Sequence, residues 1–384
     1  MLILIFLWLP AYRIFAFIPG DIKTIYVVRS IIEIFIIIPH FKLLKNKKIL
    51  LVIAYIILLC ISELINYKKY VHINDLIYTI EHSLYILSMF VFFMSLNRKD
   101  WKLFFDDIKI VAIIYIMGTI AFSIPYIGAS NIEELGIEFF VGSRAQTVQC
   151  LALLITLLLL GDYLYNGKPR ILSVILLLIS ILITVFYHSG QGMVTWCFIG
   201  MMQFLLRKNK NLLSKVFSPV KVMGVTLILN VIIVFQIYQK IPLIVWLITV
   251  FLKKDISITG RSQLYSYLPS LYDKSPIWGF GYNNTVVSDA LSSIQLGWNS
   301  AHNSLGIVMF ESGVVGLVAY LFVLYMILKV LFNKYDKDTM LIYSLFIGFM
   351  ISGIVSGVLV SNYYWMICAI ALGLYGRSSN SIYS

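Results

Sequence analysis

The feature that most constrains this chain is a succession of apolar runs, each long enough to cross a lipid bilayer as a helix. Crossing the hydrocarbon core takes about 20 apolar residues in helical form, with every backbone group hydrogen-bonded internally. The runs are continuous rather than alternating, which favours helices. Only 12% of the residues are charged, about half of what a soluble domain carries. We therefore predict an all-α polytopic membrane protein in which residues 1–384 form a single membrane domain.

The apolar runs predict about 12 transmembrane helices. We expect them at residues 2–19, 23–40, 49–66, 74–96, 107–128, 146–165, 171–187, 191–206, 218–238, 303–332, 339–359 and 361–376, the last two being compatible with one broken hairpin around Ser361 and Asn362. Basic residues are unequally divided between the two sets of loops, 17 against 9. By the positive-inside rule, the richer set and both termini are cytoplasmic, in a multi-pass protein of the cytoplasmic membrane. The net charge of +12 follows from these clusters, and we expect no nucleic-acid partner.

One segment, residues 239–302, breaks this pattern because most of it is too polar to cross a membrane. The predicted topology places it outside. Its polar part, residues 253–302, carries seven aromatic residues, which argue against disorder, and loops of this length are usually functional if they are ordered. We therefore predict a folded extracytoplasmic cap loop that carries site residues. The four cysteines have neither metal nor disulfide spacing, and no metal site is expected.

A site on the outer face has no cytosolic nucleotide, so it must take its energy from an activated substrate such as a lipid-linked diphosphate. Arginine binds phosphate oxygens bidentately, and arginines are scarce in the outer loops, which hold Arg144 and Arg261. Arg144 could instead anchor a helix end, and Arg261 could bind a carbonyl or a lipid headgroup. His302, where the long loop enters a helix, is placed to act as a general base. It could equally be a helix-start residue, with Asn303 or Ser304 as the helix cap.

Four short motifs follow one another in the C-terminal half of the chain. They are Gly260-Arg261, Ser275-Pro276-Ile277-Trp278-Gly279-Phe280-Gly281, His302-Asn303-Ser304-Leu305 and Glu311-Ser312-Gly313-Val314-Val315-Gly316. This order resembles the O-antigen polymerase and O-antigen ligase family of bacterial membrane glycosyltransferases. Two earlier outside loops, Gly142-Ser143-Arg144 and Ser189-Gly190-Gln191-Gly192, are also similar to loops of that family. The close match covers about 60 residues, while the helix layout resembles the family over the whole chain.

Two positions depart from the family's pattern. Gln191 stands where the family often has Arg, which removes one expected phosphate-binding charge. Tyr265 stands where Trp is common. The first departure puts a ligase-like pair of arginines in doubt unless Arg144 replaces the missing one, and it favours a polymerase over a ligase.

The resemblance implies a metal-independent enzyme without a cofactor that polymerises undecaprenyl-diphosphate-linked repeat units into O-antigen or capsular polysaccharide. It implies that His302 accepts the proton of the attacking sugar hydroxyl and that Arg261 neutralises the leaving diphosphate. The expected substrate-binding residues are Arg144, Gln191, Gly260 and Asn303. The implied partners are the lipid-linked glycan, membrane lipids, and a flippase and a chain-length regulator of the same pathway.

Two alternatives stay open at this point. An O-antigen ligase would use the same donor with a different acceptor. A non-catalytic flippase or transporter of lipid-linked glycans would need no long outside cap and would more often keep charged residues deep within its helices. Arg29 and Glu33 are charged residues of this kind, but they lie one helical turn apart, so pairing accounts for them.

Overall fold

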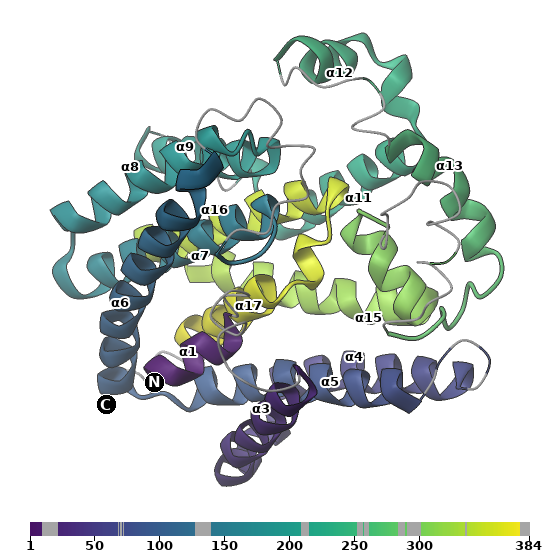
Figure 1. Ribbon diagram of the computed structural model, residues 1–384, viewed down its shortest axis with the longest axis horizontal. Coiled ribbons are helices and arrows are strands. Elements are labelled where there is room, and N and C mark those ends of the chain that lie inside the picture. The colour runs from purple at the N-terminus through teal and green to yellow at the C-terminus, as the bar shows by residue number, and fades with distance from the viewer. Residues whose placement is uncertain are drawn as a thin grey trace.

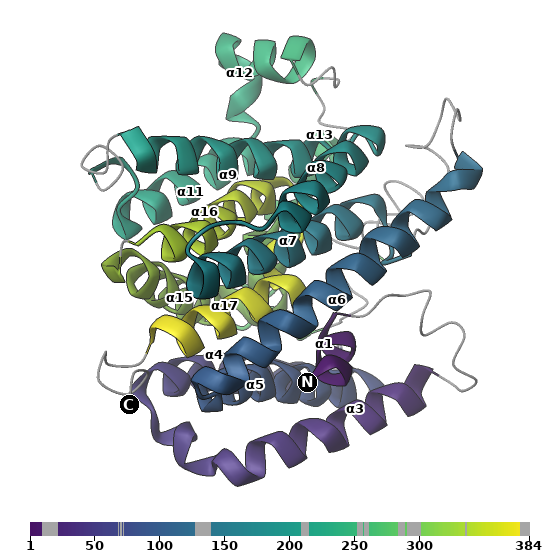
Figure 2. The ribbon, with the colours of Figure 1, turned by 90° about the vertical axis from the view of Figure 1, so that its left-hand side faces the viewer.

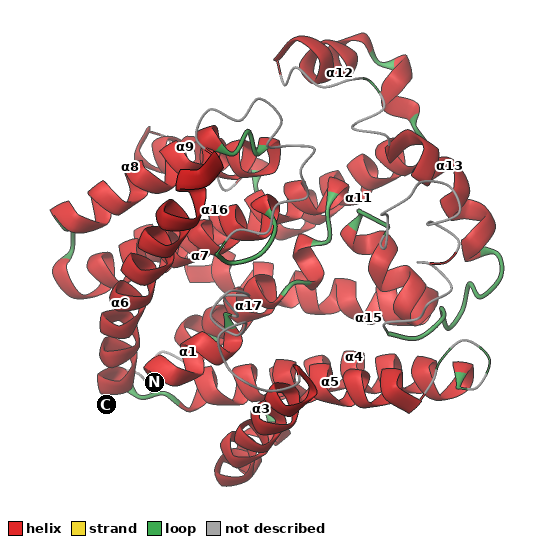
Figure 3. Cartoon of the chain, in the orientation of Figure 1, coloured by secondary structure: helices red, strands yellow, loops and turns green. Residues whose placement is uncertain are grey.

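The computed structural model of the chain describes residues 1–9, 22–67, 69, 71, 73–126, 140–208, 215–251, 256, 261–282, 289, 301–334 and 336–376. Every long element in these ranges is a helix, as Figure 1 and Figure 3 show, so the predicted all-α class is confirmed. The α-helices are α1 (Leu2–Trp8), α3 (Ile22–Ile37), α4 (Lys47–Asn66), α5 (Ile73–Ser95), α6 (Arg98–Ser123), α7 (Arg144–Asn166), α8 (Ile171–Phe186), α9 (Gly190–Lys208), α11 (Pro219–Val234), α12 (Pro242–Trp246), α13 (Arg261–Tyr272), α15 (Ser304–Lys334), α16 (Lys337–Ser352) and α17 (Asn362–Tyr375). Short 3-10 or π-helical pieces lie at Ile38–Lys45, Ile124–Tyr126, Ile237–Lys240, Leu247–Phe251, Gly353–Val355 and Val358–Val360.

Within the residues that the structure describes, each expected span contains a helix. In the described part of the chain, six helices are long and apolar enough to cross a membrane, namely Lys47–Asn66, Asp75–Ser95, Arg98–Tyr126, Arg144–Asn166, Ser304–Lys334 and Asp338–Val355. The shorter helices α8 and α11 are apolar as well. The chain is therefore a multi-pass membrane protein. The count of about 12 spans stays a prediction, because it also requires α1, α3, α9 and α17.

The bundle is built around α7, in which every residue from Thr147 to Asp162 is buried. A helix that is buried all round lies inside other helices, and α6, α8, α9 and α16 contact it. Figure 2 shows the helices stacked in layers, with α3 at one edge and α12 projecting from the other. Outer helices expose large aliphatic side chains, such as Ile171 and Leu182 of α8, which suit a lipid-facing surface.

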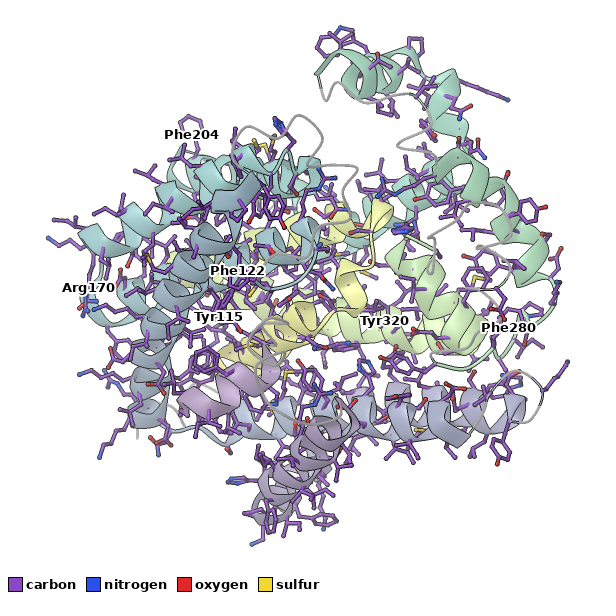
Figure 4. The ribbon with its side chains drawn as sticks, viewed as in Figure 1. Tyr115, Phe122, Arg170, Phe204, Phe280 and Tyr320 are labelled. Atoms are coloured by element: carbon purple, nitrogen blue, oxygen red, sulfur yellow. The ribbon has the colours of Figure 1, made fainter. Side chains whose placement is uncertain are left out.

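Segments expected on the same side of the membrane lie together in the structure. The ammonium of Lys48, at the start of α4, donates to the carbonyl of Gly376 after α17. Arg170, between α7 and α8, and Phe280, after α13, lie at opposite ends of the molecule in Figure 4. This arrangement is what the predicted topology requires, although which end faces the cytoplasm stays a prediction.

The charges buried in the first helices form an ion-pair cluster. Arg29 pairs with Glu33 one turn along α3, at 3.6 Å between Nε and Oε1, as the sequence predicted. It also pairs with Glu81 of α5, and its guanidinium lies 4.7 Å above the ring of Tyr85. Charges inside a membrane are stable when paired in this way. The cluster therefore has a sufficient structural role in joining α3 to α5.

Helix α15 is interrupted at Gly313, whose φ of 63° and ψ of −168° lie outside the helical region. The turn formed by residues 276–281 fills the interruption and takes up backbone groups that the helix leaves open. The bonds run from Phe280 N to Phe310 O (2.6 Å), from Gly281 N to Glu311 O (3.1 Å), from Val314 N to Pro276 O (2.9 Å) and from Val315 N to Ile277 O (3.4 Å). A broken helix at membrane depth needs such partners, because lipid cannot supply hydrogen bonds.

The described parts of the 239–302 segment include α12, the π-helical piece Leu247–Phe251, α13 and the turn that follows α13. Helix α13 has a small hydrophobic core of its own against the outer turns of α11 and α15. The core contains Leu264, Tyr265, Leu268, Leu271, Phe280, Ala301 and Phe310. Tyr272 stacks on Phe310 with ring centroids 4.3 Å apart. These contacts seat α13 on the end of the bundle where α15 begins.

Candidate functional site

Arg144 is the first residue of α7, and the preceding residue fixes the start of that helix. Ser143 and Gln146 form a capping box, in which Ser143 N donates to Gln146 Oε1 at 2.8 Å and Gln146 N donates to Ser143 Oγ at 3.4 Å. The half-buried Arg144 guanidinium donates from Nη1 to the carbonyl of Tyr187 at 3.3 Å. Because Tyr187 ends α8, this bond places a cation at the negative end of a helix. Arg144 is thereby held at the turn between α8 and α9.

Arg261 opens α13 and lies close to Arg144 in space. Burial, together with the neighbouring charge of Arg144, lowers the pKa of Arg261, while Tyr265 raises it. The guanidinium stays protonated at neutral pH, since arginine titrates above about 12. Two arginines that repel each other at one end of a bundle form a natural site for an anion with several oxygens, such as a phosphate group.

His302 adopts the left-handed backbone conformation, with φ at 45°. Non-glycine residues rarely do so, and such strain is concentrated at functional sites. Its carbonyl accepts a hydrogen bond from the Tyr265 hydroxyl of α13 at 3.3 Å. Burial, and then the charge of Arg261, lower the pKa of His302 from 6.5 to about 4. The imidazole is therefore neutral at pH 7 and has a lone pair available to accept a proton.

Asn303 caps α15, which decides between the two caps that the sequence allowed. Its Oδ1 accepts from Gly306 N at 2.7 Å. Its Nδ2 donates to Asn230 Oδ1 of α11 at 2.8 Å and to the carbonyl of Ile354 at 2.7 Å. Asn303 thus ties the start of α15 to α11 and to the 3-10 turn that follows α16. This fixes the backbone on which the adjacent His302 is carried.

Gln191 joins the same turn from α9. Its Nε2 donates to the carbonyl of Val355 at 3.5 Å, and its Oε1 accepts from Gln149 Nε2 of α7 at 3.4 Å. Since Ile354 and Val355 are consecutive, Gln191 and Asn303 are bonded to adjacent carbonyls of one turn. The side chain that stands where the family often has Arg is therefore part of a network joining α7, α9 and the turn after α16.

The structure brings together five of the six predicted site residues. The charge of Arg144 acts on Arg261, and the charge of Arg261 acts on His302. Gln191 and Asn303 both bond to the turn after α16. The sixth, Gly260, lies outside the described residues. Within the described ranges, no group of three or more His, Cys, Asp or Glu side chains could hold a metal ion.

Three residues at the site were missed or misjudged from sequence. Tyr187 supplies the carbonyl that holds Arg144, and a backbone partner leaves no side-chain signal in a sequence. Asn230 is a polar residue within the apolar helix α11, which was a usable signal for a buried contact. Tyr265 was noted only as a departure from the family, whereas its hydroxyl contacts the backbone of His302.

Comparison with protein families bears on this end of the bundle. Residues 175–321 match the family described as O-antigen ligase. The resemblance predicted from the four motifs is thus confirmed for the part of the chain that holds Gln191, Arg261, His302 and Asn303, while Arg144 lies before it. No curated protein and no solved structure matches the chain.

Proposed function

We propose that this protein is a membrane glycosyltransferase that polymerises undecaprenyl-diphosphate-linked oligosaccharide repeat units at the outer face of the cytoplasmic membrane. The observation that carries the proposal is the grouping of Arg144, Arg261 and His302 at one end of the bundle. The O-antigen ligase family domain supports it, because that family processes glycans of this type. The proposal includes 12 spans, cytoplasmic termini and an outside cap.

The two arginines would hold the diphosphate of the donor. Their charges lie close enough to disfavour each other, and a dianionic group between them removes that repulsion. Each guanidinium can present two parallel N–H groups to phosphate oxygens. The same contacts strengthen as negative charge grows on the departing diphosphate, which lowers the barrier to transfer.

His302 would act on the acceptor. A hydroxyl oxygen of one lipid-linked unit attacks the anomeric carbon of the growing chain, and a new glycosidic C–O bond forms. The bond from that carbon to the diphosphate oxygen breaks, and the electron pair leaves with the polyprenyl diphosphate. The hydroxyl proton passes to the neutral imidazole. A direct displacement of this kind inverts the anomeric centre.

Donor binding would also prepare His302 for this role. In the structure, burial and the Arg261 charge hold the pKa of His302 at about 4, which makes it a weak base. A diphosphate bound at Arg261 offsets the positive charge that acts on the imidazole. The pKa of His302 should then rise towards the operating pH, where a general base is most effective. Proton transfer is thereby coupled to the presence of the donor.

An O-antigen ligase remains the second candidate, because the matched domain carries that description and the donor chemistry is the same. Gln191 favours the polymerase, since an amide stands where the family often has a phosphate-binding Arg, and this amide bonds to the carbonyl of Val355. A flippase and a chain-length regulator of the same pathway are the partners that a polymerase would need.

The test is glycan transfer by the purified protein in lipid nanodiscs, with an undecaprenyl-diphosphate-linked oligosaccharide as the only substrate. A ladder of repeat units that forms in the presence of a chelator supports a metal-independent polymerase. His302→Ala should abolish transfer and leave donor affinity within about twofold, whereas Arg261→Ala should weaken donor binding as well. Normal polymer from His302→Ala, or no transfer by the wild-type protein with any acceptor, would overturn the proposal.

A further inference from the structure

The turn formed by residues 276–282 lies between two helices and bonds to both. Its backbone N–H groups at 280 and 281, and its carbonyls at 276 and 277, bond to the interruption in α15. Its carbonyls at 278 and 279 and its N–H at 282 bond to α4, which lies outside the matched residues 175–321. The turn is therefore hydrogen-bonded by two helices, α15 and, from the N-terminal half of the chain, α4.

Three side chains on one face of α4 make these contacts. The Ser62 hydroxyl is shared between the carbonyl of Trp278 and the carbonyl of Glu311 on α15, the second at 2.7 Å. Asn66 Nδ2 donates to the carbonyl of Gly279 at 3.1 Å. Glu63 Oε2 accepts from the backbone N–H of Tyr282 at 2.6 Å. We name Ser62, Glu63 and Asn66 the α4 clamp.

Glycines in the turn and at the interruption of α15 show how closely the turn, α15 and α4 approach one another. A Cβ at Gly279 would lie 2.5 Å from the carbonyl oxygen of Phe310, and one at Gly313 would overlap the backbone of Ile277. A Cβ at Gly281 would lie 2.5 Å from Glu63 Oε2. All three glycines have positive φ, which other residues rarely adopt. The Pro-x-x-Gly-x-Gly and Glu-x-Gly-x-x-Gly motifs are therefore two halves of one contact, and α4 closes it.

This contact sets the position of α13. The turn begins four residues after the end of α13, and Phe280 lies in the small core that α13 shares with α15. At the same end of the bundle, Arg261 opens α13, and Tyr265 in the next turn donates to the carbonyl of His302. Fixing the turn thus fixes α13 relative to the start of α15. The distance between the Arg261 guanidinium and the His302 imidazole depends on that relation.

We propose that Ser62, Glu63 and Asn66 are positioning residues for glycan transfer, which set Arg261 against His302 by clamping the 276–282 turn into the interruption of α15. The inference rests on the proposed function. The clamp touches neither donor nor acceptor, so its loss should lower kcat while leaving donor affinity nearly unchanged. A misplacement of about 1 Å in a catalytic constellation costs up to about a hundredfold in rate.

The test compares Asn66→Ala with Ser88→Ala as a matched control. Ser88 is also a buried polar residue of a membrane helix, but among the described residues its hydroxyl bonds within its own helix α5, to the carbonyl of Tyr85. Asn66→Ala should lower kcat at least about tenfold, with donor affinity within about twofold and a normal amount of folded protein. Ser88→Ala should keep kcat within about twofold. Equal kcat losses in the two variants, or wild-type kcat in Asn66→Ala, would overturn the clamp.

A second pair of variants separates positioning from charge. Glu63→Gln keeps an oxygen that accepts the Tyr282 N–H, so it should retain activity within about threefold, whereas Glu63→Leu should lose about as much as Asn66→Ala. Failure of Gln to rescue would contradict a purely positioning role for this residue.

Hydrogen exchange distinguishes failure of the clamp from failure of the proposed function. The amides of residues 280 and 281 should exchange at least about tenfold faster in Asn66→Ala than in Ser88→Ala, and this readout needs no activity. If the wild-type protein transfers no glycan but exchange responds to Asn66, the proposed function fails and the clamp survives as a structural contact. If the wild-type protein transfers glycan but Asn66→Ala changes neither the amide exchange rates nor kcat, only the clamp proposal fails.

Discussion

Replacing Arg261 by Gln should move the acidic limb of the pH–rate profile to higher pH. The charge of Arg261 is the second cause, after burial, that lowers the pKa of His302 from 6.5 to about 4. Gln removes the charge and leaves the burial, so the new pKa should lie between about 4 and 6.5. Because the base must be neutral to accept a proton, activity is present above the pKa of His302 and is lost as the pH falls through it.

The size of the effect follows from these limits. At pH 5, an imidazole with a pKa of about 4 is neutral in roughly 90% of molecules, and one with a pKa of 6.5 in roughly 3%. The loss that acts through His302 at pH 5 therefore has an upper bound of about thirtyfold. At pH 8 both imidazoles are neutral, and this contribution disappears. A loss that persists at pH 8 measures the missing contact with the diphosphate instead.

The assay is kcat/KM for glycan transfer from pH 4.5 to 8.5 in nanodiscs, measured on wild-type protein, Arg261→Gln and Arg144→Gln. Arg144 is the matched control, because its charge acts on Arg261 and is not among the causes that shift the pKa of His302. The acidic limb of the pH–rate profile of Arg144→Gln should stay close to its wild-type position. A limb that stays in place or moves to lower pH in Arg261→Gln would refute the coupling of Arg261 to the titrating base.

Three further predictions concern the arginine chemistry, the helix break and the topology. Arg261→Lys should restore less than about a tenth of wild-type transfer, measured as polymer yield, because a point charge cannot reproduce the bidentate fork. Gly313→Ala should lower the free energy of unfolding by at least about 1–3 kcal/mol because of its positive φ, while Gly224→Ala, where a Cβ meets nothing within 4 Å, should not, as thermal unfolding in detergent can show. Cysteines introduced at Ser292 and Lys210, both outside the described residues, should react with an impermeant thiol reagent from opposite sides of the membrane, and labelling from one side would mean that the helix count between them is wrong.

The helices could be predicted from sequence because their signals are local. An apolar run marks the helix, and a polar capping residue directly before the run marks where the helix begins. Ser143 before α7 and Asn303 before α15 are such capping residues. The sequence also paired Arg29 with Glu33 correctly, since one turn of helix brings them together. It did not predict the contact with Glu81, because which helix lies beside α3 depends on tertiary packing.

The site could be predicted in part for a related reason. The sequence named Arg144, Arg261 and His302 from their side chains, and the structure places all three at one end of the bundle. It could not show that the turn after α13 pairs with the interruption in α15, because that pairing consists of backbone hydrogen bonds. Glu63 was visible only as a charge in an apolar run, and its partner, the N–H of Tyr282, has no sequence signature.

The interruption in α15 also limits how this end of the protein can work. Undocking the turn would leave the backbone groups of Phe310, Glu311, Val314 and Val315 without their partners at membrane depth. Each unpaired buried group costs about 1–3 kcal/mol, so the docked turn is favoured by several kcal/mol. The end of α13 must therefore stay seated while a donor binds. Arg261 and His302 are then held in a fixed relation before the reaction begins, and preorganised groups of this kind stabilise developing charge without a cost of rearrangement.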